Sequence, residues 1–258
     1  MAALWTPFSY VGEYAFTAAN LRRRWAKLHA GDREPWPCDA KVVAAWVLFH
    51  RGEFEKAAQA GLKAGSSGLT VANKATCMYA NYLEPSEKAR RELFLQVAQR
   101  GAEQAAADPT HANAFYWQAY ALARYSQGIS VAKALAQGLG GKVKTALETA
   151  IALQPEHADA HVALGAFHAE VIDKVGTLIG NMTYGAKKNT SLALFTRALA
   201  LTPQSQLALM EYANALVMLE GDTRMDEATA LYERATQITP QDAAERLDVD
   251  MAIAELAD

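Results

Sequence analysis

Three histidines near the middle of the chain have a spacing that could bind a metal ion. His157, His161 and His168 lie at i, i+4 and i+11, which at ~100° per residue puts them within about 40° of one another around a helix. Two histidines one turn apart can chelate a metal. No glutamate accompanies them as in HExxH sites, and His161 and His168 stand where large packing side chains recur in neighbouring segments. The pattern favours packed, hydrogen-bonded histidines, with a metal site as the alternative.

A glycine-rich segment, Gly138-Leu139-Gly140-Gly141-Lys142, is comparable with a phosphate-binding loop. Such a loop needs a glycine where Ala136 stands, a Ser or Thr where Val143 stands, and a strand before it. The preceding segment has the pattern of a helix, so the glycines indicate a flexible helix boundary. Because no nucleophile–base constellation or convincing metal ligand set is found either, we expect a non-enzymatic protein without a cofactor.

Composition narrows the class of protein further. The chain has 258 residues, 51% of them hydrophobic, and a net charge of −3, so nothing attracts it globally to nucleic acid. Cys38 and Cys77 form no CxxC pair, which favours a reducing compartment. No stretch approaches the ~20 apolar residues of a membrane span, and residues 1–8 do not have the pattern of a secretory signal. We therefore expect a cytoplasmic protein with no membrane span and no nucleic-acid partner.

The whole chain has the sequence pattern of helices. Ala, Leu, Glu, Gln and Lys recur with apolar spacings of three and four, and no sustained two-residue alternation appears. The predicted class is all-α, with helices at about residues 10–29, 39–50, 53–64, 69–83, 86–107, 111–126, 142–153, 157–172, 187–201, 205–219, 225–237 and 241–256.

An internal repeat organises these helices. Asp108-Pro109-Thr110-His111-Ala112-Asn113-Ala114 returns as Gln154-Pro155-Glu156-His157-Ala158-Asp159-Ala160, 46 positions later, and Pro203 and Pro240 end later segments in the same way. A fixed-period echo indicates a repeat protein, in which helix pairs stack because one pair cannot bury its apolar face alone. We expect a right-handed superhelix of antiparallel pairs over residues 39–258, with an aromatic helical segment at residues 1–38 packed on it as part of one structural domain.

The packing register within each pair is similar to the tetratricopeptide (TPR) consensus. The eighth residue of the first helix is small where two helices must cross closely, and the second helix carries a bulky residue, then an alanine, then a proline. The small residues are Ala119, Gly165 and Ala213, the bulky ones Leu147, Phe195 and Tyr232, and the alanines Ala150, Ala198 and Ala235.

Two units depart from the 34-residue TPR period. The units that begin at Ala112 and Ala158 reach their closing prolines 12 and 14 residues late, so each carries a long insertion between its two helices. Because the insertions are partly apolar, we expect them to pack back on the body; the residues concerned are Ile129, Val131, Leu135, Val175, Leu178 and Ile179.

The insertions and the repeat motifs together resemble a known family. The run Ala150-Ile151-Ala152-Leu153-Gln154-Pro155-Glu156, then His161-Val162-Ala163-Leu164-Gly165, then Phe195-x-x-Ala198-x-x-Leu201-x-Pro203, resembles the TPR-like domain of the regulator of microtubule dynamics family. It is also similar to the bacterial TatT proteins associated with TRAP transporters. The resemblance covers about residues 86–256. It implies a helical scaffold for protein contacts and, in some relatives, an apolar tunnel for lipids or other hydrophobic ligands.

The residues that face the concave side of a TPR-like stack form the predicted binding groove. They are the second, fifth, ninth and thirteenth of each first helix, and here they are apolar and aromatic with few charges. No lysine stands at the fifth position, which disfavours the carboxylate clamp of chaperone adaptors. We expect a protein segment or small hydrophobic ligand, with Arg124 orienting a carboxylate or phosphate. The groove residues are Tyr116, Tyr120, Arg124, Val162, Met210, Asn214 and Met218.

The N-terminal region offers an alternative surface for assembly. Arg22-Arg23-Arg24-Trp25-Ala26-Lys27 is a basic cluster that could contact anionic lipid or an acidic partner. A solvated helix face whose aromatic side caps the first helical pair is the favoured interpretation, because one short basic run is weak support for surface binding. The aromatic residues nearby are Trp5, Phe8, Tyr10, Tyr14 and Phe16.

Overall fold

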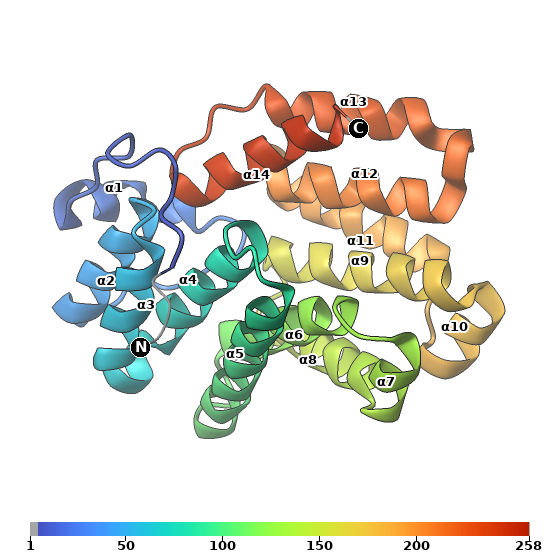
Figure 1. Ribbon diagram of the computed structural model, residues 1–258, viewed down its shortest axis with the longest axis horizontal. Coiled ribbons are helices and arrows are strands. Elements are labelled where there is room, and N and C mark those ends of the chain that lie inside the picture. The colour runs from blue at the N-terminus through green and yellow to red at the C-terminus, as the bar shows by residue number, and fades with distance from the viewer. Residues whose placement is uncertain (1–4, 258) are drawn as a thin grey trace. The chain divides into compact units, whose positions relative to one another are not determined.

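The computed structural model describes residues 5–257, which contain helices and connecting segments and no β-strand (Figure 1). The predicted all-α class is confirmed. Contacts divide the chain into two compact units. The N-terminal unit contains residues 5–29, 34–146 and 241–244, and the C-terminal unit contains residues 30–33, 147–240 and 245–257. The expected boundary after residue 38, and the single domain from residue 39 onward, stay predictions.

In the N-terminal unit, α2 packs on α3, α3 on α4, α4 on α5 and α5 on α6. Polar N-caps start several of these helices: Asp39 accepts from the Lys41 N–H and Ser86 from the Ala89 N–H. The helices are α1 (Ala18–Leu28), α2 (Ala40–His50), α3 (Phe54–Lys63), α4 (Leu69–Tyr82), α5 (Glu87–Ala107), α6 (Ala112–Gln127), α7 (Val131–Ala136) and the first half of α8 (Leu139–Leu153), with a short 3₁₀-helix, η1 (Gly65–Gly68), before α4.

In the C-terminal unit, α9 packs on α11 and α12, and α12 packs on α13. These contacts give two consecutive helix pairs, α9 with α11 and α12 with α13, and α10 is the insertion within the first pair. The elements are the second half of α8, α9 (Ala158–Val175), α10 (Thr177–Tyr184), α11 (Lys188–Leu201), α12 (Gln206–Glu220), the 3₁₀-helix η2 (Gly221–Arg224), α13 (Met225–Thr236) and most of α14 (Ala243–Glu255).

Gly165 is the point of closest approach between α9 and α11. A Cβ atom added there would lie 2.9 Å from Cε2 of Phe195, and the Ser191 hydroxyl donates to the Gly165 carbonyl at 2.7 Å. The predicted small-against-bulky crossing is therefore confirmed at this pair. Another close crossing, which the repeat register did not predict, lies between α5 and α6, where a Cβ on Gly101 would meet the Gln118 backbone N at 2.9 Å.

The first helix is shorter than predicted. It begins at Ala18 instead of residue 10, because Thr17 and Asn20 form a capping box in which each side chain accepts from the other residue's backbone N–H. The preceding segment, residues 5–17, contains neither helix nor strand and is anchored by the buried side chains of Phe8 and Phe16. Gly12 allows its tight bend with φ +89°.

The expected packing of the insertions against the body is wrong for most of their apolar residues. Val131 and Leu135 on α7 are exposed, and Leu178 on α10 is 73% exposed with Ile179 next to it also exposed. For α10 the physical reason is that this helix approaches α9 through Gly180, where a Cβ would lie 3.0 Å from Cγ1 of Val171. A small residue makes the contact, so the large apolar side chains point away from it.

None of the helices described between residues 5 and 257 combines the length and the apolar character needed to cross a bilayer.

Candidate functional site

The predicted groove residues of the N-terminal unit lie together on α6. Tyr116 and Tyr120 are buried with ring centroids 6.2 Å apart. The guanidinium of Arg124 lies over the Tyr120 ring, 5.4 Å from its centroid, and donates to Gln127 Oε1 at 3.3 Å. Arg124 is therefore held against the aromatic face by a cation–π contact. The two tyrosine rings are almost wholly enclosed, with 2% and 8% of their surface exposed, so of the three residues predicted for the groove on α6 only Arg124 is half-buried.

The predicted groove residues of the C-terminal unit differ in accessibility. Val162 and Met210 are buried within its hydrophobic core, Val162 beside Phe195 and Met210 beside Leu216. Their positions on the first helix of each pair are as expected, but their side chains are core. Met218 is exposed.

Asn214 is half-buried in the C-terminal unit and accepts a hydrogen bond from the Tyr232 hydroxyl. The bond fixes the amide beside Met218, because Tyr232 can donate only to the oxygen of the Asn214 side chain. Of the residues predicted for the groove in this unit, Asn214 and Met218 are therefore the two whose side chains are not enclosed in the core.

Tyr232 should titrate far above an ordinary tyrosine. Burial, followed by the charges of Glu255 and Glu211, raises its pKa from 10.0 to about 12. The raised value contributes stability that is complete below pH 10 and is lost as the pH rises through about 12. An ultraviolet difference titration of the wild type against Tyr232→Phe should give a midpoint near pH 12. A midpoint near pH 10 would show that this hydroxyl is solvated.

The three histidines at residues 157–168 each bond to backbone groups. His157 is the N-cap of α9 and accepts from the Ala160 N–H at 3.1 Å. His161 Nε2–H donates to the Pro155 carbonyl at 3.1 Å, and His168 Nδ1 accepts from the Lys187 N–H at 3.4 Å. Across residues 5–257, no group of three or more His, Cys, Asp or Glu side chains is arranged to hold a metal. These histidines position the ends of helices.

The glycine-rich segment lies at a helix boundary. Helix α7 ends at Ala136, Gly138 has φ +62°, and α8 starts at Leu139. This φ lies in the left-handed region that glycine adopts at little cost, so Gly138 separates the two helices.

The basic cluster on α1 is partly used to hold another segment of the N-terminal unit. Arg24 Nη2 donates to the Gln241 carbonyl at 2.8 Å, and Lys27 Nζ donates to Gln241 Oε1 at 3.1 Å. Arg22 and Arg23 stay exposed, and the Arg22 guanidinium lies over the Trp36 ring, 5.7 Å from its centroid. Arg22, Arg24 and Lys27 thus each contact another segment of the unit, and Arg23 is exposed.

A cluster of buried polar side chains, which the sequence did not predict, lies beside this contact. His50 Nδ1–H donates to Asp242 Oδ2 at 2.5 Å, and Nε2 of His50 lies 3.3 Å from Nε2 of His29. All three side chains are buried, and the Trp25 ring stacks on His29 at 3.8 Å. His50 and Asp242 are 192 positions apart, so no local sequence signal could pair them. This polar cluster connects three segments of the N-terminal unit that are distant in the sequence.

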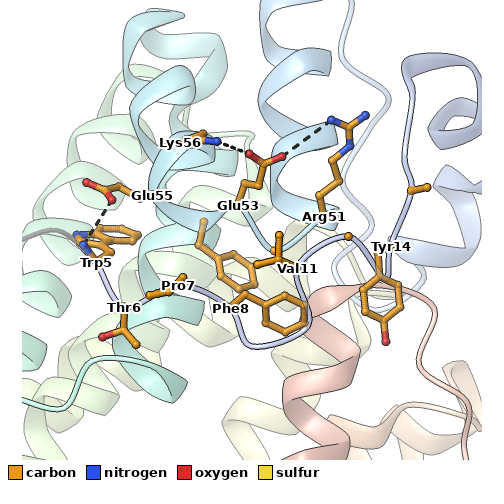
Figure 2. A pocket seen from close by; sticks show the side chains of 14 residues that line it. Trp5, Thr6, Pro7, Phe8, Val11, Tyr14, Arg51, Glu53, Glu55 and Lys56 are labelled. Atoms are coloured by element: carbon orange, nitrogen blue, oxygen red, sulfur yellow. Dashed lines mark hydrogen bonds and ion pairs between the residues drawn. The ribbon is translucent and has the colours of Figure 1, made fainter.

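The N-terminal pocket is a cavity of about 530 Å³ between residues 5–15 and the turn from α2 to α3 (Figure 2). It lies wholly within the N-terminal unit. Its lining residues are Trp5, Thr6, Pro7, Phe8, Val11, Gly12, Tyr14, Ala15, Arg51, Gly52, Glu53, Phe54, Glu55 and Lys56. Trp5, Phe8 and Tyr14 belong to the aromatic region predicted as an alternative surface for assembly, but no sequence pattern predicted a cavity there.

Aromatic packing and close backbone approach shape the pocket. Trp5 stacks on Tyr79 with centroids 4.1 Å apart, and the buried Phe8 meets Phe54 edge-on at 6.1 Å. Gly52, with φ +83°, has no space for a side chain, since a Cβ would lie 2.4 Å from Phe8 Cδ1. These contacts make the floor rigid.

Tyr79 holds the start of the pocket loop in place. Its hydroxyl donates to Glu84 Oε2 at 2.8 Å and accepts from the Thr6 N–H at 3.3 Å. Burial, followed by the bond to Glu84, raises the pKa of Tyr79 above its ordinary value, so the phenol stays protonated and can keep donating.

Helix pairs with a small residue at the crossing define this chain as a TPR-like helical repeat protein. A family model described as "Regulator of microtubule dynamics protein 1-3" matches residues 53–256, and the chain belongs to that family. The crystal structure of TTC0263, a thermophilic TPR protein of Thermus thermophilus, matches with a TM-score of 0.59 at 16% identity, covering 83% of this chain and 97% of that one. At this identity the likeness shows the fold alone. Comparison with curated proteins finds no match.

Proposed function

We propose that this protein is a non-enzymatic interaction scaffold that uses a concave helix face to hold a protein segment or a small hydrophobic ligand. The observation that carries the proposal is the TPR-like architecture, in which first helices of successive pairs present one side chain per turn to a common face. Membership of the regulator of microtubule dynamics protein 1-3 family supports a scaffold role.

The groove would combine aromatic and soft apolar side chains. The buried rings of Tyr116 and Tyr120 would form the rigid support beneath the groove, and the exposed Met218 would supply a flexible, polarisable side chain that adapts to an apolar ligand. Arg124 would pair with a carboxylate or phosphate of the ligand by charge-assisted hydrogen bonds. A reducing, cytoplasmic location is part of the proposal and fits the free thiols of Cys38 and Cys77.

A Met218→Asp variant should fold normally and lose its partner or ligand. Met218 is 38% exposed, so a carboxylate is tolerated in the free protein, but enclosing it beside an apolar ligand is costly. Met210→Asp is unsuitable, because Met210 belongs to the core and its replacement would unfold the unit. Native mass spectrometry of lightly purified protein, with circular dichroism for folding, makes the measurement.

Met225→Asp provides the matched control for this variant. Met225 is a methionine of the same unit, 40% exposed at the start of α13 and outside the predicted groove. The Met225→Asp variant should therefore retain the same partner or ligand as the wild type. Retention of the same molecule by folded Met218→Asp would reject the groove as the binding surface.

The alternative function is assembly through the N-terminal aromatic and basic region. Arg22 and Arg23 are exposed on α1, beside residues that already contact another part of the N-terminal unit. Charge reversal at both residues, with the groove intact, would abolish assembly on an acidic partner in this case and leave it unchanged in the groove model.

A further inference from the structure

We propose that the N-terminal pocket binds an extended peptide segment of a partner protein, in which an apolar side chain stands between an acidic and a basic residue. None of the residues that line the pocket belongs to the predicted groove. The inference therefore assigns a second interaction surface and goes beyond the proposed function.

The centre of the pocket is suited to an apolar side chain. Phe8 and Phe54 line it and meet edge-on, and Val11 lies on the loop of residues 5–15 with 75% of its surface exposed. An apolar lining that opens to solvent at a concave surface is typical of binding sites. The volume of about 530 Å³ holds an aromatic or long aliphatic side chain together with the backbone on either side of it.

The rim of the pocket has a positive end. Lys56 Nζ lies 2.6 Å from Glu53 Oε2, and Arg51 Nη1 lies 3.9 Å from Glu53 Oε1, so two cations share one carboxylate. The Arg51 guanidinium also donates to the Phe16 carbonyl, which fixes its position. Because Lys56 makes the closer pair with Glu53, Arg51 is the cation that marks the positive end of the rim, and Figure 2 shows the Lys56–Glu53 pair between Arg51 and Glu55.

The opposite end of the rim is negative. The Glu55 carboxylate accepts from the backbone N–H of Trp5 at 3.4 Å and from the side-chain amide of Gln59 at 3.3 Å. Both of these donors are neutral. Figure 2 shows Glu55 and Trp5 at one end of the pocket and Arg51 at the other. A segment with opposite charges on the two sides of its apolar residue is therefore complementary to this rim.

The shape of the pocket favours an extended peptide. Residues 5–16 on its outer side contain neither helix nor strand. The backbone groups at the two ends of this loop are already bonded, since the Trp5 and Thr6 N–H groups donate to Glu55 and Tyr79 and the Phe16 carbonyl accepts from Arg51. Main-chain bonds to a partner would therefore come from the part of the loop between these ends. Extended segments are commonly recognised by such backbone bonds with a pocket for one side chain. A wholly apolar molecule would leave both charged ends unmatched.

Short peptides test the charge pattern directly. The probe is acetyl-Asp-Gly-Phe-Gly-Lys-amide, titrated into the full chain and followed by NMR chemical shifts. It should bind up to about fivefold more tightly than peptides with two Asp or two Lys residues, the range of an exposed ion pair. The peptide with Gly in place of Phe should bind more than about tenfold more weakly. Equal binding by the three charged peptides would overturn the proposal.

Two variants locate the binding in the pocket. Val11→Asp should weaken binding of the probe about tenfold, whereas Leu62→Asp, at a 44% exposed leucine on α3 outside the pocket, should bind as the wild type does. Glu55→Lys should shift the preference to the peptide with two Asp residues. Unchanged binding by Val11→Asp, or loss of self-association in that variant without an effect on the peptide, would overturn the proposal; the second result would assign the pocket to another copy of this chain.

The Met218→Asp variant distinguishes binding in the N-terminal pocket from binding in the groove. It should bind the probe peptide as the wild type does, because Met218 does not line the pocket. The proposal for the groove and the proposal for the pocket are therefore tested by different variants, and either one can fail without the other.

Discussion

Asp242→Ala is expected to lower the free energy of unfolding by about 3–5 kcal/mol, because it removes one partner of a buried pair and leaves the other without its acceptor. His50 and Asp242 are both buried, and their bond of 2.5 Å ties residues 241–244 to α2. The midpoint of thermal unfolding should fall by about 10 °C, given about 2–4 °C per kcal/mol for a chain of this size. Chemical denaturation with the same variant gives the free energy directly.

Asp250→Ala is the control for this loss. Asp250 accepts from Arg246 at 2.9 Å in a partly exposed pair on α14, and such pairs contribute about 0–1 kcal/mol. A small effect at Asp250 beside a large effect at Asp242 would confirm that burial makes the difference. Equal, small losses would show that the His50–Asp242 contact is open to water.

Gly165→Leu should destabilise the C-terminal unit by about 1–3 kcal/mol through overpacking. The first added carbon would already lie 2.9 Å from the Phe195 ring, and Phe195 is fully buried and stacked on Tyr212. The ring therefore cannot retreat without disturbing α12 as well. Thermal unfolding followed by circular dichroism measures the loss.

Gly141→Ala is the matched control. Gly141 lies in α8 with nothing within 4 Å of an added Cβ, so alanine should be neutral or stabilise by up to about 1 kcal/mol. If Gly165→Leu left the unfolding midpoint unchanged, the repeat register that places Gly165 at the crossing would be wrong.

Most of the fold was predictable because it depends on local periodicity. The helices from α2 to α6 begin and end within two residues of the predicted positions, since N-caps, prolines and apolar spacing are read within a few residues of each boundary. The pairing of Gly165 with Phe195 followed from the repeat register. The start of α1 could not be placed, because the aromatic residues before Thr17 fit an amphipathic helix as well as the anchored loop that they form.

The site was less predictable, because it depends on contacts between distant segments. The repeat template placed Met210 and Met218 on the same face of one helix but could not show that Met210 is enclosed by the core while Met218 is exposed. The N-terminal pocket required residues 5–15 to fold over the turn before Phe54, and the His50–Asp242 bond required segments 192 positions apart to meet. No local periodicity encodes these contacts.

The most direct test of the groove is position-specific photo-crosslinking in the cells that make the protein. A benzophenone amino acid at position 218 should crosslink a protein segment or hydrophobic molecule, while the same group at position 225, at an equally exposed methionine outside the groove, should not. Circular dichroism of both substituted proteins establishes that they are folded. Crosslinks of equal yield from the two positions, or crosslinks from position 225 alone, would contradict the account of this protein as a scaffold that binds through its concave face.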